Sequence, residues 1–147
     1  MIHFLFIQNT QGITRISKWW YSNLTDQEKH RIENEAHRML AFRKDDETNF
    51  VAFNLGKSTC KLVFRRYASL LFTLCVDLYD NDLAMLESIH LVVEILDLYF
   101  KNVCEVDIIF NFATVYKVID EVFLAGEFQE MCSANVLARL EETEKLE

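Results

Sequence analysis

The sequence contains no proline and only 3 glycines among its 147 residues. Flexible linkers and proline-rich recognition tails depend on these residues, so the composition gives no reason to place a domain boundary inside the chain. With 51% hydrophobic and 26% charged residues, the chain is not of a disordered or fibrous class. We therefore expect one domain over residues 1–147 that buries its own core, with a charged tail at about 141–147.

Positive charge is also scarce. The chain has 15 Lys and Arg against 23 Asp and Glu, which gives a formal net charge of −8. Nucleic acid and anionic lipid select for basic faces, so neither is expected as a direct partner of the whole surface. No apolar run approaches the ~18 residues of a membrane span, and the first residues lack the pattern of a secretory signal. These features predict a cytoplasmic protein.

Signatures of catalysis and of metal binding are missing as well. The G-K-S-T segment at 56–59 lacks the phosphate-loop glycine, because position 51 is Val, and an expected strand rather than a helix follows it. No C-x-x-C pair occurs, and the spacing favours buried thiols in a reducing compartment for Cys60, Cys75, Cys104 and Cys132. The histidines do not have metal-ligand spacing: His3, His30, His37 and His90. We expect no cofactor and no enzymatic activity.

Hydrophobic periodicity and turn signals predict an α+β domain. Alternating or continuous apolar patterns predict strands at 2–8, 13–21, 49–53, 61–66 and 70–77. Helical periodicity predicts helices at 25–42, 81–100 and 105–124, the last stopping at Ala125-Gly126, and a short helix before the charged tail. This order indicates an antiparallel sheet with helices on its faces.

Two features leave alternatives open. The segment R-R-Y-A-S-L-L-F at 65–72 is either a strand with a charged end or the rim of a site that places positive charge beside apolar pockets. The helices expected at 81–100 and 105–124 are apolar on more than one face. That excess indicates either a permanent partner or a crowded but self-sufficient core.

Several segments closely resemble the small (sigma) subunits of clathrin adaptor complexes, and the likeness extends through Leu140. They include V-F-R-R-Y-A-S-L-L-F at 63–72, V-E-I-L-D-L-Y-F at 93–100, V-C-E-V-D-I-I-F-N-F at 103–112 and D-E-V-F-L-A-G-E at 120–127. The T-N-F-V segment and the F-L-A-G-E ending are most similar to adaptor complex 2, with adaptor complex 1 as the alternative. One departure is the loop Asn54–Cys60, which is longer than the family's usual connection.

The resemblance implies a longin-like (SNARE-like) fold, with a five-stranded antiparallel sheet flanked by helices on both faces. It implies a heterotetramer in which this chain packs on an alpha- or gamma-type large adaptin, beside a second large subunit and a medium subunit. Clathrin and the membrane would be reached only through that complex, at plasma-membrane coated pits or, for complex 1, at the trans-Golgi network and endosomes. A stand-alone longin-type trafficking regulator is the less favoured alternative.

The family's small subunit helps to recognise acidic dileucine signals, [D/E]-x-x-x-L-[L/I], in the tails of membrane cargo. Matched residue by residue, the resemblance implies that Arg15 faces the acidic position of the signal. It implies that the paired leucines are surrounded by Tyr67, Ala68, Leu70, Val93, Asn102, Val103 and Ile108. Arg65 and Arg66 either add positive potential at the rim or are ordinary solvated charges.

Overall fold

The computed structural model describes residues 1–20, 23–41, 43, 48–56, 58–124, 127–128 and 137–142. Its main strands are β1 (Ile2–Asn9), β2 (Thr14–Trp19), β3 (Phe50–Leu55), β4 (Ser58–Tyr67) and β5 (Leu70–Asp77). Its helices are α1 (Asp26–Ala41), α2 (Asp82–Phe100), α3 (Glu105–Phe110) and α4 (Phe112–Val122), and a two-stranded ribbon joins β6 (Phe123–Leu124) to β7 (Glu127–Phe128). None of the helices in these ranges is long and apolar enough to cross a membrane.

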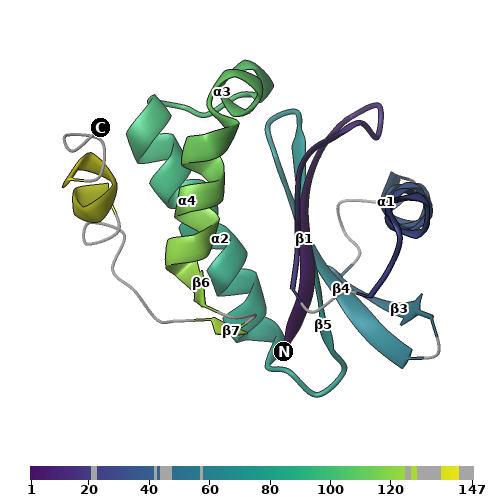
Figure 1. Cartoon of the computed structure of the whole chain (residues 1–147). Helices are drawn as coiled ribbons and strands as arrows, with labels where there is room; N and C mark the ends of the chain where they lie inside the picture. Colours follow the sequence, from purple (N-terminus) through teal and green to yellow (C-terminus); the bar gives the residue numbers. More distant parts are fainter. Residues whose placement is uncertain are drawn as a thin grey trace.

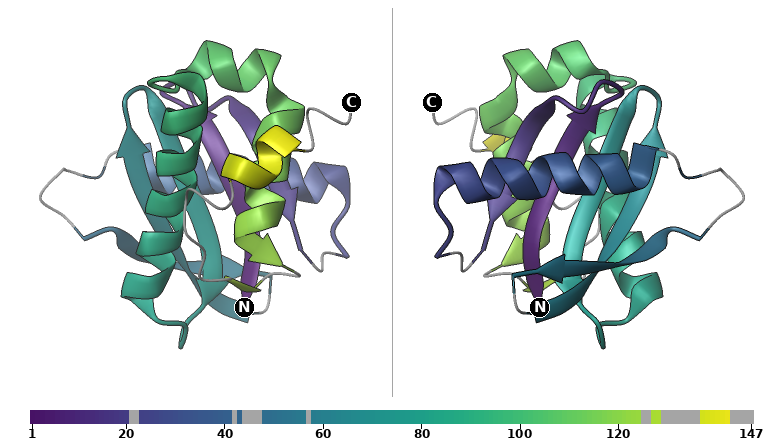
Figure 2. Two further views of the ribbon diagram at one scale, coloured as in Figure 1. Left: turned by 90° about the vertical axis from the view of Figure 1, so that its left-hand side faces the viewer. Right: turned by 90° about the vertical axis from the view of Figure 1, so that its right-hand side faces the viewer.

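The five long strands form one sheet in the order β2-β1-β5-β4-β3, and every neighbouring pair is antiparallel. Helix α1 covers one face of this sheet, while α2 and α4 cover the other (Figure 1). The views from the two sides show these layers separately (Figure 2). The predicted fold class, a five-stranded antiparallel sheet flanked by helices on both faces, is confirmed.

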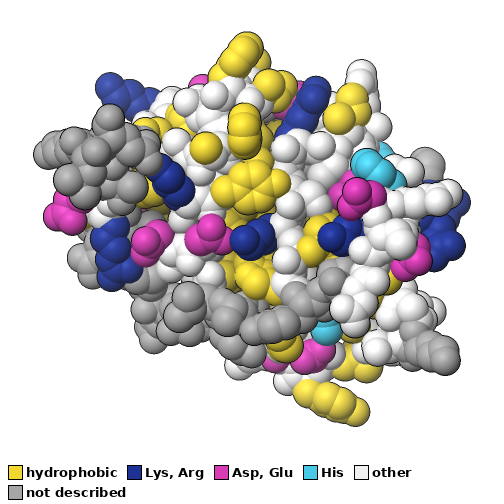
Figure 3. All heavy atoms as spheres, viewed as in Figure 1, with side chains coloured by type: hydrophobic (Ala, Val, Ile, Leu, Met, Phe, Trp, Pro, Cys, Tyr) yellow, Lys and Arg dark blue, Asp and Glu magenta, His cyan; other side chains and the backbone are white. Residues whose placement is uncertain are grey.

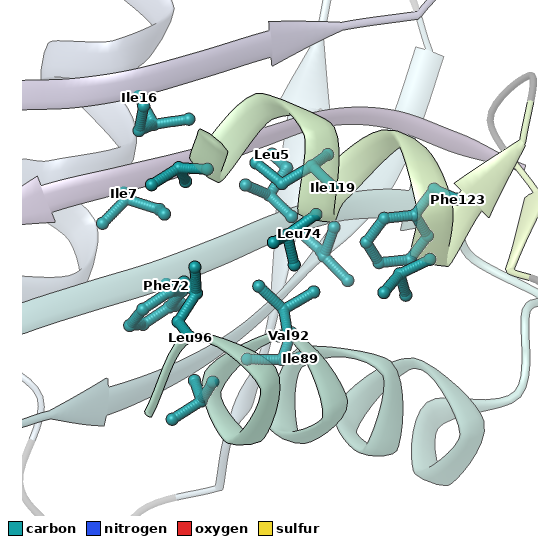
Figure 4. Packing of buried hydrophobic residues seen from close by; sticks show 14 of the residues in the cluster. Leu5, Ile7, Ile16, Phe72, Leu74, Ile89, Val92, Leu96, Ile119 and Phe123 are labelled. Atoms are coloured by element: carbon teal, nitrogen blue, oxygen red, sulfur yellow. The ribbon is translucent and has the colours of Figure 1, made fainter. Parts of the chain in front are cut away.

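Strand β1 is apolar on both alternations because it is covered on both faces. Phe4 and Phe6 pack in the cluster beneath α1, with ring centroids 4.1 Å apart. Leu5 and Ile7 belong to the larger cluster on the other face. There they meet residues of α2 and α4 such as Ile119 (Figure 4). Successive strand residues point to opposite faces, so the two alternations of one strand stabilise two separate cores.

Most of the apolar excess of α2 is used inside the chain. Its buried residues are Met85, Ser88, Ile89, Val92, Val93, Ile95 and Leu96, whereas Leu83 and Leu98 are 70% and 54% exposed. A second group of exposed apolar side chains lies on α3 and at the start of α4: Val106, Ile109, Phe110 and Phe112. Hydrophobic side chains are visible over this end of the molecule in Figure 3. Self-sufficient packing therefore accounts for most of α2, and the exposed apolar side chains of α3 and the start of α4 form a surface that a partner could cover.

The structure corrects four local expectations. The helix predicted at 105–124 is broken at Asn111, whose backbone is not helical (φ −128°, ψ 35°) and whose side-chain amide donates to the Asp107 carbonyl at 3.0 Å. Such side-chain bonds compete with the helical ladder.

The predicted loop Asn54–Cys60 is mostly strand, since β3 and β4 pair up to Leu55 and Ser58. The charged tail was predicted to begin at about 141, but residues 141 and 142 still belong to a helical segment at 137–142. The predicted helix stop at 125–126 and residues 143–147 of the tail lie outside the described residues. Cys104 is exposed, not buried, and Cys132 lies outside the described residues.

The β1–β2 turn depends on Gly12, which yields a first prediction. Gly12 has φ +83°, and a Cβ built there would lie 2.5 Å from Cδ2 of the His37 ring. Because both the backbone and the contact disfavour a side chain, Gly12→Ala should lower the free energy of unfolding by more than the about 1–2 kcal/mol that the left-handed backbone costs alone. Urea denaturation of the full chain measures this change.

Gly56→Ala is the matched control for this substitution. Gly56 also has a positive φ (+65°), but nothing lies within 4 Å of the point where a Cβ would stand. Its cost should therefore be the backbone term alone, and the difference between the two variants isolates the contact with His37. Equal losses in both variants would contradict a steric role of His37.

Candidate functional site

The turn between β4 and β5 places the first group of predicted site residues. Tyr67 and Leu70 are paired across the strands, and Ala68 and Ser69 form the exposed two-residue turn between them. Ala68 has φ 53°, the left-handed conformation that short hairpin turns require. The strands predicted at 61–66 and 70–77 left residues 67–69 for a reversal between them, and the structure has it there.

Four apolar residues predicted for the leucine site belong to one buried cluster. Leu70 comes from β5, Val93 from α2, Val103 from the α2–α3 connection and Ile108 from α3, and their exposures are 1%, 4%, 3% and 0%. Tyr67 packs against the same cluster. The structure thus brings these five residues together, although its own side chains cover them. These residues would have to become accessible before a guest leucine could contact them.

Ala68 and Asn102 lie at the surface beside this cluster rather than within it. Both are exposed, and both have positive φ, 53° and 76°. Lys101, which ends α2, also has a left-handed backbone (φ 56°). The predicted site therefore consists of a buried apolar floor and two strained, exposed backbone segments at its edge.

Asp97 holds these segments together, although its sequence position had not marked it as a site residue. Its carboxylate accepts a short hydrogen bond from the Tyr67 hydroxyl and another from the Val103 amide at 2.9 Å. Its carbonyl accepts from the Asn102 amide at 3.2 Å. The hydrogen bond to Asp97 raises the pKa of Tyr67 above its usual value. A carboxylate in the last turn of a helix interacts unfavourably with the negative end of the helix dipole. The position of Asp97 near the end of α2 could therefore have indicated from the sequence that it has a specific hydrogen-bond donor.

Arg15 is positioned by an ion pair within the chain. Its Nε donates to Oε1 of Glu105 at 2.8 Å, and the Asn9 side-chain amide donates to the same oxygen at 2.9 Å. These donors hold the pKa of Glu105 below its usual value, with Arg15 the largest cause. Glu105 and Ile108 are three residues apart on α3, so they lie on the same side of that helix. The pair therefore sets Arg15 next to the apolar cluster.

The pairing also shows that Arg15 is already engaged by a carboxylate. Both side chains are partly exposed, 31% for Arg15 and 26% for Glu105. An incoming acidic group would compete with Glu105 for the guanidinium. Neither Glu105 nor Asn9 was singled out from the sequence. Glu105 is 90 residues from Arg15 and 96 residues from Asn9, so no local sequence pattern could show that these side chains meet.

Arg65 and Arg66 do not form one basic site. Consecutive strand residues point to opposite faces. Nη1 of Arg65 lies 3.3 Å from Nδ1 of His90 on α2. Nη2 of Arg66 instead donates, at 2.9 Å, to the carbonyl of Leu40 near the end of α1. Both are exposed. Of the two alternatives for the R-R pair, separate solvated strand-end charges fit this arrangement better.

Comparisons with known proteins are consistent along the whole chain. The family model described as clathrin adaptor complex small chain matches residues 1–147. An AP-2 complex subunit sigma of Aspergillus fumigatus is 50% identical over 148 residues, covering 100% of this chain and 99% of the relative. The protein of the same name from Dictyostelium discoideum is 52% identical and covers 96% of both chains.

Two further comparisons bear on the assignment. An AP-1 complex subunit sigma-2 of Dictyostelium discoideum is 44% identical, covering 98% of this chain and 90% of the relative. Among structures, a chain of the "Homology model of the full-length AP-3 complex in a stretched open conformation" superposes with a TM-score of 0.77. It is 26% identical and covers 99% of this chain and 95% of that chain.

Proposed function

The chain belongs to the family of clathrin adaptor complex small chains, and we propose that it is the sigma subunit of adaptor complex 2. The observation that carries the choice of complex is sequence identity over matched lengths. The two AP-2 sigma relatives described above share 50% and 52% of residues with this chain, against 44% for the AP-1 relative. Adaptor complex 1 is the alternative. The role is a structural and binding one at clathrin-coated pits, without catalysis.

The proposed partner is an alpha-type large adaptin, within a heterotetramer that also holds a second large and a medium subunit. The exposed apolar surface of α3 and the start of α4 supports a permanent partner, since Phe110 and Phe112 are 78% and 58% exposed. Water contact with such side chains is unfavourable by about 25 cal/mol per Å². Burial against a large subunit would remove this cost.

Co-expression tests this assignment. The full chain should co-purify with the N-terminal part of an alpha-type large subunit and much less with that of a gamma-type subunit. The measurement is the stoichiometry of tag-purified complexes after size-exclusion chromatography. Preferential recovery with the gamma-type subunit would reassign the chain to adaptor complex 1. A monodisperse, cooperatively melting monomer with affinity for neither subunit would support the stand-alone regulator instead.

The same assay locates the contact surface. Phe110→Asp and Phe112→Asp alter exposed side chains, so the fold should survive while co-purification falls sharply. Tyr79→Asp is the matched control, because Tyr79 is 98% exposed and lies in the β5–α2 turn instead of on α3. Loss of the complex with Tyr79→Asp and not with the phenylalanine variants would place the contact at the other end of α2.

We further propose that the cluster around Leu70, Val93 and Val103 takes the paired leucines of an acidic dileucine signal. Burial of two leucines contributes about 3–6 kcal/mol, and ordering an extended peptide offsets part of that. A partly exposed pair with Arg15 adds about 0–1 kcal/mol. Such a signal binds weakly by itself, so several contacts at one membrane would supply the remaining affinity. The buried state of the cluster fits a site that opens on binding.

A further inference from the structure

Three neighbouring strands bring an imidazole, a thiol and a carboxylate together at one end of the sheet. His3 lies in β1, Cys60 in β4 and Asp77 at the end of β5, which is the strand between the other two. One candidate ligand atom from each residue lies within 4.8 Å of the other two. This cluster is separate from the predicted leucine site, whose residues come mainly from the β4–β5 hairpin end, α2, the α2–α3 connection and α3.

The backbone explains why the three side chains meet. Cys60 and Asp77 are directly opposite in the register of β4 and β5, so their side chains leave the sheet on the same face. On the other side of β5, the pairing with β1 shifts between Ile2 and Phe4. A bulge of this kind re-aims a side chain. Here it lets His3 reach the carboxylate at 2.7 Å, from Nε2 to Oδ1.

The surroundings of the cluster leave it accessible from one side. Cys60 is 1% exposed and forms the floor, while the side chains of His3 and Asp77 are 26% and 50% exposed. The second oxygen of Asp77 accepts from the Met1 amino group at 3.1 Å, which neutralises the carboxylate without a metal.

We propose that His3, Cys60 and Asp77 form a binding site for a divalent transition-metal ion of the zinc class. Imidazole nitrogen, thiolate sulfur and carboxylate oxygen are the ligands that Zn²⁺ takes, and three protein ligands with one water are common around it. Calcium and magnesium are disfavoured because they require mostly oxygen ligands. In a tetrahedral site the ligand atoms are about 3.5 Å apart, whereas here the His3 and Asp77 atoms are 2.7 Å apart and no pair of ligand atoms is more than 4.8 Å apart. Metal binding therefore needs only small shifts, in which His3 and Asp77 move apart and exchange their hydrogen bond for metal bonds.

Metal titration of the purified full chain tests the proposal. The probes are Zn²⁺, followed by competition with a chromophoric chelator, and Co²⁺, followed by absorption. We expect one ion per chain at this site, a thiolate-to-cobalt charge-transfer band, the strong visible bands of tetrahedral cobalt, and a higher melting temperature with zinc. Zinc affinity should fall in each of three variants, His3→Gln, Cys60→Ser and Asp77→Asn. The loss should be at least ~10–100-fold, which is the typical effect of removing a residue that only supports a metal ligand.

Control variants distinguish this site from chance binding. His30→Gln and Cys104→Ser change an exposed histidine and an exposed cysteine elsewhere and should leave zinc affinity and the cobalt spectrum unchanged. His3→Gln keeps the test valid if the buried Cys60 variant fails to fold, because His3 is partly exposed. The proposal is overturned if cobalt gives no thiolate band, or if the three ligand variants bind zinc as tightly as the wild type. In that case the cluster is a histidine–aspartate hydrogen bond beside a buried thiol.

Discussion

Dileucine peptides should no longer bind when Ala68 is replaced by tryptophan or Val103 by aspartate. Ala68 is exposed in the β4–β5 turn next to Leu70, so an indole there would fill the entrance to the apolar cluster. Val103 is 3% exposed within that cluster, and a carboxylate at its position would be desolvated among apolar groups at a cost of several kcal/mol. Loss of ~3–6 kcal/mol of leucine burial corresponds to more than about a hundredfold in affinity.

The measurement is the fluorescence anisotropy of a labelled peptide titrated with the reconstituted adaptor complex. Ala52→Trp is the control, since Ala52 is also exposed but lies on the edge strand β3 instead of in the β4–β5 turn. It adds the same aromatic surface far from the turn and should leave binding unchanged. Because Val103→Asp also perturbs the core, Ala68→Trp is the deciding variant. Unchanged affinity of a folded Ala68→Trp complex would show that the leucines bind elsewhere.

The parts of this structure that sequence predicts are those with local causes. Residues 2–8 are apolar on both alternations, which predicts a strand covered on both faces, and Phe4 and Leu5 do enter opposite cores. The strands predicted on either side of residues 67–69 placed a reversal there, and the structure makes it a two-residue turn in which Ala68 has a positive φ. The helix predicted from residue 25 begins at Asp26, and the Thr25 hydroxyl caps it by accepting from the Glu28 amide at 3.2 Å. Each of these signals acts over a few residues, so it can be read without the fold.

Most of the features that sequence did not predict depend on distant contacts, and the local hydrogen bond from Asn111 to Asp107 is the exception. The apolar pattern is similar on both sides of Asn111, so it did not predict the break between α3 and α4. Asp97 lies in the helix predicted at 81–100 and was not expected to have a special role, yet its carboxylate accepts hydrogen bonds from both Tyr67 and Val103. His3 and Asp77 are 74 residues apart, and only the strand order places them together. The residues of the leucine site came from family resemblance, and that assignment stays a prediction.

Reversing the charge of Arg15 should weaken peptides that carry Glu or Asp upstream of the leucines by more than about tenfold, or ~1.4 kcal/mol. Arg15→Glu would place two carboxylates, its own and that of Glu105, at the position proposed for the acidic residue. Arg15→Ala should have a smaller effect, because an exposed charge pair contributes only about 0–1 kcal/mol. Peptides with Ala at the acidic position should respond little to either change. High salt should shrink the differences, since the pair is partly exposed.

Glu105 provides the complementary test, because it holds the guanidinium when no peptide is bound. Glu105→Gln removes the competing charge but keeps an acceptor for Arg15 and Asn9, so it should strengthen acidic peptides and leave the Ala peptide unchanged. Titrating both peptides against wild type, Arg15→Ala, Glu105→Gln and the double variant gives a double-mutant cycle. If Arg15→Ala loses the same free energy with both peptides, Arg15 does not read the acidic residue. The Arg15–Glu105 pair would then serve only to fix α3 against β2, and the apolar half of the site would have to account for recognition.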